Sequence, residues 1–209
     1  WLKQGVIEPS WNVPGSIGCW RGCTLDRAVS NFESFKNHVS VLFWSLGNES
    51  YAGDILVEMN RYYKEKDPDR LVHYEGVAEN RPYEDLISDM ESQMYAPPEK
   101  IKEYLENNPK KPFILCEYMH DMGNSLGGME SYIRLLDQYE DYQGGFIWDY
   151  IDQALFVKDE VTGRDVLRYG GDFDDRPSDY EFSGNGILFA DRTEKPAMQE
   201  VRHYYGLRR

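Results

Sequence analysis

The chain has 209 residues, is 41% hydrophobic and carries 23 basic against 37 acidic residues, a formal net charge of -14. This charge argues against nucleic acids and anionic membranes as partners, and no apolar run approaches the roughly 20 residues that a membrane span needs. The negative net charge is compatible with a neutral ligand. The 14% aromatic content suits either a sugar site or a large core.

The three cysteines, Cys19, Cys23 and Cys116, have neither the spacing of a disulfide framework nor that of a zinc site. We therefore expect reduced thiols and a cytoplasmic protein. All three are expected to be structural, with Cys116 a small apolar residue inside a strand.

Helices and strands alternate along the predicted chain. Residues 1–23 form an irregular lead-in that is interrupted by proline and glycine. The elements expected after it are, in order, a helix over 24–37, a strand over 40–46, a helix over 53–66, strands over 71–74 and 87–95 separated by a polar loop, a helix from 97 to 107, a strand over 112–116, a helix over 126–139 and a strand over 144–148.

This alternation without a sequence repeat predicts an α/β fold with a parallel sheet. A closed (β/α)₈ TIM barrel needs eight strands and typically about 250 residues. Residues 24–152 are therefore expected to supply the last five strands of such a barrel. Residues 153–209 are expected to form rim loops and hairpins.

Two of the predicted strands lead into glutamates, Glu49 and Glu117. Barrel enzymes build their sites at the C-terminal ends of the strands, so these two side chains would converge at one mouth. Most glycoside hydrolases use two carboxylates, which flank the glycosidic bond that is cleaved. Taken singly, each glutamate could also be a solvated loop acid, and their convergence favours an active site.

Several sequence blocks identify a family. They occur in order at Trp44–Ser50 (WSLGNES), Met94-Tyr95, Glu117–His120 (EYMH), Met122–Ser125 (MGNS), Gly144–Gln153 (GGFIWDYIDQ) and Tyr169–Phe173 (YGGDF). Together they resemble the large β-galactosidases of glycoside hydrolase family 2, from about Glu8 to the C-terminus. The Asn-Glu pair is shared by a wider clan, whereas the MGNS and WDYIDQ blocks are more specific to the β-galactosidases.

The resemblance implies retaining hydrolysis of terminal β-D-galactose residues, as in lactose, through a covalent galactosyl-enzyme intermediate. It implies that Glu49 is the acid/base and Glu117 the nucleophile, with carboxyl groups about 5–5.5 Å apart. By the same resemblance, substrate-binding roles fall to Asn48, Met94, Tyr95, His120 and Trp148. Tyr95 would donate a hydrogen bond to Glu117, and the peptide bond from Trp148 to Asp149 would be cis.

Two metal ions follow from the resemblance. Glu49 matches one ligand of a magnesium ion whose other protein ligands lie upstream of residue 1. Phe182, through its carbonyl, and Asn185 match two ligands of a sodium ion. Both metal sites are incomplete in this chain.

The parent protein is expected to be a homo-oligomer.

Asp121 follows His120 where relatives usually carry a small residue. If it points into the site, its charge would raise the pKa of Glu117; the favoured alternative is that it faces solvent. Three other readings of the function stay open. The chain could be a catalytically incomplete fragment, a sugar-binding module, or a family 2 glycosidase that acts on another sugar.

Overall fold

The computed structural model describes residues 15–206, which divide between two compact units. The first unit contains the chain up to Met94 together with Asn107–Cys116. The second contains Tyr95–Glu106 and the chain from Glu117 onward. The boundary therefore passes through the strand that carries Glu117.

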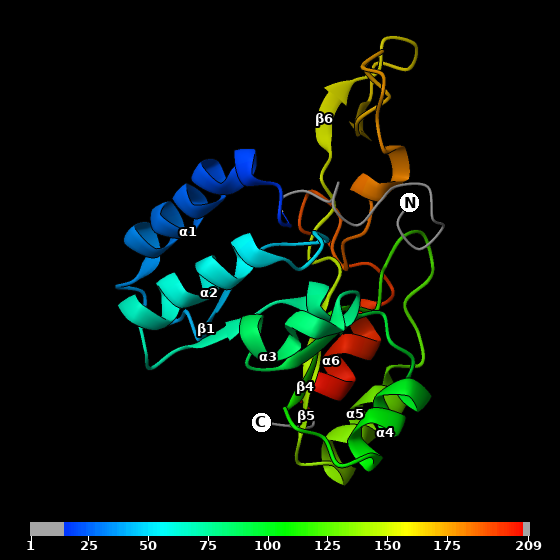
Figure 1. The fold of residues 1–209 in the computed structure, drawn as a ribbon. Coiled ribbons are helices and arrows are strands. Elements are labelled where there is room, and N and C mark those ends of the chain that lie inside the picture. Colours follow the sequence, from blue (N-terminus) through cyan, green and yellow to red (C-terminus); the bar gives the residue numbers. More distant parts are fainter. Residues whose placement is uncertain (1–14, 207–209) are drawn as a thin grey trace. The chain divides into compact units, whose positions relative to one another are not determined.

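In the first unit, two helices lie side by side, α1 (Arg21–Phe35) and α2 (Asp54–Lys66), as Figure 1 shows. The short 3-10 helix η2 (Gly18–Trp20) leads into α1. The strand between the two helices, β1 (Phe43–Ser45), pairs in parallel with β2 (Leu71–His73). This confirms the predicted strand, helix and parallel strand, although β1 is shorter than predicted.

Aromatic rings fill the core of this unit. Trp44 stacks on Tyr63 with 5.2 Å between ring centroids, and Phe32 lies 5.5 Å from Trp44 in a tilted arrangement. Trp44 and Tyr63 are 2% and 1% exposed. Each ring comes from a different element, so this cluster fastens α1 and α2 to β1.

The segment after β2 differs from its prediction. Instead of a polar loop and a strand from Ile87, it forms the 3-10 helices η3 (Glu75–Ala78) and η4 (Arg81–Tyr83), the short α3 (Glu84–Ile87) and then β3 (Glu91–Met94). Asp89 exchanges hydrogen bonds with Val72, its backbone N–H donating at 2.8 Å and its carboxylate accepting at 2.6 Å. These bonds turn the chain back to β2, so β3 begins only at Glu91.

Strand β4 (Phe113–Tyr118) lies between β3 and β5 (Tyr142–Ile147) in one three-stranded sheet. In the first unit, the Glu91 N–H donates to the Pro112 carbonyl at 2.9 Å. In the second, the Trp148 N–H donates to the Tyr118 carbonyl at 3.0 Å. β4 extends two residues beyond the predicted strand and includes Glu117.

The second unit contains the predicted helices α4 (Pro98–Glu106) and α5 (Met129–Gln138). The antiparallel hairpin of β6 (Leu155–Lys158) and β7 (Asp165–Arg168) and the 3-10 helix η5 (Tyr180–Ser183) follow β5. Figure 1 shows β6 well away from α4, α5 and α6. The helix α6 (Met198–Gly206) lies where only loops and hairpins were expected. It forms because Val201 and Met129 share a small apolar core.

The α/β fold is confirmed, but a closed barrel is not seen. Across residues 15–206, the strands β1 to β5 fall into two sheets, β1-β2 and β3-β4-β5. None of the helices described there combines the length and apolarity required to cross a membrane.

One partly buried carboxylate in the first unit, that of Asp67, predicts a pH-dependent stability. Asp67 Oδ2 accepts hydrogen bonds from Trp44 Nε1 at 2.9 Å and from Arg70 at 2.6 Å. Burial opposes the ionised form, but these two donors outweigh it and hold the pKa of Asp67 below its ordinary value. Its stabilising effect is therefore present above the pKa of the unfolded chain, about 3.9, and is lost as the pH falls through the folded value.

We expect Asp67→Asn to lower the free energy of unfolding of the intact protein by about 1–3 kcal/mol at pH 7. The loss should shrink as the pH is lowered from about 5 toward about 3. Urea unfolding at each pH measures it. Asp69→Asn, at an exposed position nearby, is the control and should change little. Equal effects of the two substitutions would contradict the prediction.

Candidate active site

Asn48 and Glu49 lie in the turn that follows β1, in the first unit, and both side chains are exposed. Glu49 has a φ of 52°, in the left-handed region that residues with a Cβ rarely adopt. Its backbone N–H donates to the carboxylate of Glu75, at the end of β2. Glu75 was not among the predicted site residues, although it is an acid just after a strand, as Glu49 and Glu117 were predicted to be.

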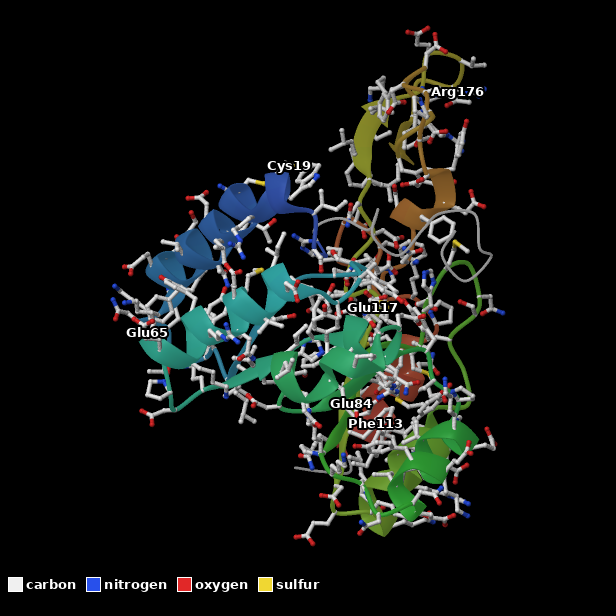
Figure 2. The ribbon with its side chains drawn as sticks, viewed as in Figure 1. Cys19, Glu65, Glu84, Phe113, Glu117 and Arg176 are labelled. Atoms are coloured by element: carbon white, nitrogen blue, oxygen red, sulfur yellow. The ribbon has the colours of Figure 1, made fainter. Side chains whose placement is uncertain are left out.

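Glu117, labelled in Figure 2, is the penultimate residue of β4. The Tyr95 hydroxyl donates to Glu117 Oε2 at 2.6 Å, and the Tyr95 backbone N–H donates to the Glu117 carbonyl at 2.9 Å. Tyr95 follows β3 directly and has a φ of 52°. Tyr95 therefore holds Glu117 by one hydrogen bond to its carboxylate and one to its backbone carbonyl.

Aromatic rings lie beside Tyr95 in the second unit. The ring of His120 lies 5.7 Å from that of Tyr95 and 5.9 Å from that of Phe182, measured between centroids. His120 follows Met119, whose φ of 53° turns the chain sharply after β4. The structure thus brings together Tyr95, His120 and Phe182 in the unit that carries Glu117.

Trp148 lies immediately after β5 and is 38% exposed. Its peptide bond to Asp149 is cis, as the family resemblance implied. The Trp148 carbonyl accepts from the Asp121 N–H at 2.9 Å, and the Asp149 N–H donates to the Asn185 carbonyl at 2.7 Å. The backbone of Trp148 is thus held on both sides, while its ring can still receive a ligand.

Asn185 has an unusual polar atom. The side chain is 3% exposed, its amide nitrogen donates to the Phe182 carbonyl, and its Oδ1 is buried without a hydrogen-bond partner. An amide oxygen that is buried without a partner suits a hard cation, which prefers oxygen ligands. Phe182 and Asn185 therefore fit the two sodium ligands expected of them.

The magnesium expectation is less well supported. Glu49 supplies one exposed carboxylate, and a single carboxylate does not define a magnesium site. A different group, His73, Glu75 and Cys116, places potential ligand atoms within 4.8 Å of one another. Both ring nitrogens of His73 are already hydrogen-bonded, to Ser45 at 2.9 Å and Ser92 at 2.7 Å. Burial lowers the pKa of His73 to about 4, so its ring is neutral near pH 7 and belongs to a hydrogen-bonded network with Ser45 and Ser92.

Met94 ends β3 and is half-buried in the first unit. Asn48, Glu49 and Met94 thus belong to the first unit, whereas Tyr95, Glu117, His120 and Trp148 belong to the second. The spacing of about 5–5.5 Å between the two glutamates stays a prediction.

The favoured expectation for Asp121 is wrong, because its side chain is 1% exposed. Its carboxylate accepts from the Leu126 N–H, and its Oδ2 is buried without a hydrogen-bond partner. The charges that act on it are those of Lys195, Asp152 and His120. Lys195 is paired with Asp152 at 2.8 Å, and its charge offsets only part of the cost of burying the Asp121 carboxylate.

Burial raises the pKa of Asp121 above its ordinary value. A raised pKa means that its stabilising contribution is present below the unfolded pKa of about 3.9 and is lost as the pH rises through the folded value. We therefore expect Asp121→Asn to gain thermal stability relative to the unmodified protein as the pH rises from about 4 to 8. Asp141→Asn, at an exposed position of the same unit, should show no such trend. A relative loss for Asp121→Asn at the higher pH would refute this.

Comparisons with known proteins identify the family of the chain. Residues 1–208 match the family described as glycosyl hydrolases family 2, TIM barrel domain. The chain is 72% identical over 206 residues to the β-galactosidase large subunit of Latilactobacillus sakei, and 69% identical over 207 residues to that of Lactobacillus helveticus. These alignments cover 99% of this chain and 33% of each relative, so the chain spans about a third of their length.

The β-galactosidase of Halalkalibacterium halodurans is 60% identical, over 98% of this chain and 20% of that protein. Among solved structures, the β-glucuronidase of Lactobacillus rhamnosus superposes with a TM-score of 0.59 at 18% identity, over 88% of this chain and 35% of that one. At that identity the likeness shows the fold alone. From the match over residues 1–208 and the identities to its β-galactosidase relatives, the chain belongs to glycosyl hydrolase family 2, as part of its TIM barrel domain.

Proposed function

We propose that the protein containing this chain is a retaining β-galactosidase that releases terminal β-D-galactose from β-galactosides such as lactose. The observation that carries the proposal is the 2.6 Å hydrogen bond from Tyr95 to Glu117, which fixes a carboxylate at the end of a strand. The names of the relatives at 60–72% identity support galactose as the sugar. The resemblance to β-glucuronidases supports only the fold, so it does not favour the reading of another sugar.

In the proposed reaction, a Glu117 oxygen attacks the anomeric carbon while Glu49 gives its proton to the departing glycosidic oxygen. The bond from the sugar to its aglycone breaks as the bond to Glu117 forms. Glu49, now ionised, then takes a proton from water. The water oxygen bonds to the anomeric carbon while the bond to Glu117 breaks, so that galactose is released and the Glu117 carboxylate is restored. Tyr95 keeps the Glu117 carboxylate in line for the first attack.

The remaining side chains would bind the sugar. The half-exposed ring of Trp148 offers a surface for the apolar face of a galactose ring, and His120 and Asn48 offer polar groups for its hydroxyls. Met94 would supply an apolar contact. The net charge of -14 suits this neutral substrate.

A sodium ion would be held by the Phe182 carbonyl and by Asn185 Oδ1, together with ligands from outside these residues. When bound, the sodium ion could be coordinated by a hydroxyl oxygen of the sugar. For magnesium, Glu49 is the ligand that this chain offers, and no step is assigned to that ion.

The relatives named as large subunits suggest a second, small subunit as a partner of the intact protein. Since the chain covers about a third of those subunits, the strands that would complete a barrel come from elsewhere in the protein. The three cysteines are free thiols, which supports the cytoplasmic setting we propose. The isolated segment alone would be the catalytically incomplete fragment considered above.

Hydrolysis of a chromogenic β-galactoside by the intact protein tests this function. We expect Glu117→Gln to abolish turnover, because the nucleophile is lost. Tyr95→Phe should lower kcat by about 10- to 100-fold, the equivalent of one hydrogen bond to a charged group. Tyr139→Phe is the matched control, because its hydroxyl donates at 2.7 Å to a different carboxylate, Glu106.

If the intact protein binds galactosides without hydrolysing them, and Glu117→Gln binds as tightly, the protein is a sugar-binding module instead. Equal effects of Tyr95→Phe and Tyr139→Phe would remove the role assigned to Tyr95.

Asn185→Ala tests the sodium ligands. Removing the buried Oδ1 takes away one ligand, so we expect a higher sodium concentration for half-maximal activity. The titration is made with choline chloride replacing sodium chloride, so that ionic strength stays constant. An unchanged sodium dependence would show that Asn185 holds no sodium.

A further inference from the structure

The turn that carries Glu49 does not have a conformation that its own residues favour. Glu49 has a φ of 52°, a value that glycine adopts easily and residues with a Cβ rarely do. Neither Glu49 nor the next residue, Ser50, is a glycine. A side chain in this conformation persists only where the surroundings hold it. The groups that hold it therefore determine where the Glu49 carboxyl lies.

Two consecutive residues at the end of β2 hold the backbone on both sides of Glu49. The Glu75 carboxylate accepts from the Glu49 N–H, and the Tyr74 hydroxyl donates to the Ser50 carbonyl. Tyr74 is 0% and Glu75 7% exposed, so both groups act from a buried position. Hydrogen bonds to a carboxylate are stronger than those between neutral groups, and little water competes at this depth.

The next residue, Gly76, brings the segment close enough for these bonds. A Cβ built at Gly76 would lie 2.4 Å from the Ser50 carbonyl oxygen and 2.4 Å from the Tyr74 ring. Only glycine therefore allows the two backbones to approach. Tyr74, Glu75 and Gly76 all contact the same turn, one by its hydroxyl, one by its carboxylate and one by its lack of a side chain.

We propose that Glu75 and Tyr74 are positioning residues that hold the acid/base residue Glu49 in its working orientation. The inference rests on the proposed function and deepens it. Neither residue exchanges a proton with the substrate. Their loss should therefore impair the steps that need Glu49 as acid or base and spare those that do not.

Leaving-group dependence separates these steps. Release of 2,4-dinitrophenolate needs no proton, whereas release of glucose from lactose does. For Glu75→Ala in the intact protein, we expect kcat/KM for lactose to fall about 10- to 100-fold, as misplacement of a catalytic group does. For the dinitrophenyl galactoside, kcat/KM should stay within about threefold of the unmodified value, because its first step uses Glu117 alone.

Azide supplies a second signature. Hydrolysis of the galactosyl intermediate needs Glu49 as a base, but azide is already an anion and attacks without one. With the dinitrophenyl substrate, azide should restore the kcat of Glu75→Ala and yield galactosyl azide. A purely structural role for Glu75 predicts no such rescue.

Conservative and matched variants complete the experiment. Glu75→Gln keeps an acceptor oxygen and should recover most of the lactose activity, while Tyr74→Phe loses only the hydroxyl and should show a weaker form of the same pattern. Glu91→Gln removes an equally buried carboxylate, 4% exposed and paired with Arg81 at 2.7 Å, and should affect both substrates alike. If Glu75→Ala does not fold, Tyr74→Phe carries the test.

The outcomes separate this inference from the function on which it rests. Equal losses on lactose and the dinitrophenyl galactoside, or no loss on either, would overturn the positioning role. If Glu49→Ala shows leaving-group selectivity and azide rescue but neither Glu75→Ala nor Tyr74→Phe does, the proposed function stands and this inference alone falls. An unmodified protein that hydrolyses neither galactoside would overturn both.

Discussion

The candidate site depends on backbone that departs from strand geometry just beyond the strand ends. Glu49, Tyr95 and Met119 follow β1, β3 and β4 closely and have φ values of 52°, 52° and 53°. Each position has a Cβ, so the conformation is costly and must be maintained by neighbouring groups. This geometry lifts side chains out of the alternating strand pattern and toward one end of a sheet. A regular strand would have sent successive side chains to opposite faces.

Two aspartates show a similar balance, between the cost of removing a carboxylate from water and the donors and charges around it. Asp67 is partly buried and Asp121 fully buried, and their pKa values move in opposite directions. Two donors, from Trp44 and Arg70, meet the Asp67 carboxylate. Lys195, whose charge favours the ionised form of Asp121, is itself paired with Asp152, and burial dominates there. The number of free donors within reach, more than depth alone, decides whether a carboxylate stabilises this fold.

The sequence predicted what depends on periodicity and on local blocks of residues. The helix over Asp54–Lys66 and the parallel pairing of β1 with β2 follow from an apolar stripe and an apolar run. The pattern did not predict the break before β3, because Asp89 bonds to Val72, a residue 17 positions earlier. It misplaced Asp121 for a similar reason, since an aspartate beside a glycine-rich turn is usually solvated and its burial depends on distant residues. The role proposed for Glu75 could not be predicted from the sequence, because its hydrogen-bond partner is a backbone N–H, which every residue but proline carries.

In each unit, the residue proposed to be catalytic, or the turn that carries it, is held by residues that follow the adjacent strand. Glu75 and Tyr74, after β2, hold the turn of Glu49, and Tyr95, after β3, holds Glu117. Parallel strands end at one edge of a sheet, so the residue after one strand is the natural neighbour of the residue after the next. The position of a side chain at the end of one strand therefore depends on the neighbouring strand as well as on its own. A barrel enzyme of this design can therefore exchange the loops farther from the sheet while the carboxylates keep their positions, because the groups that fix them come from the ends of adjacent strands.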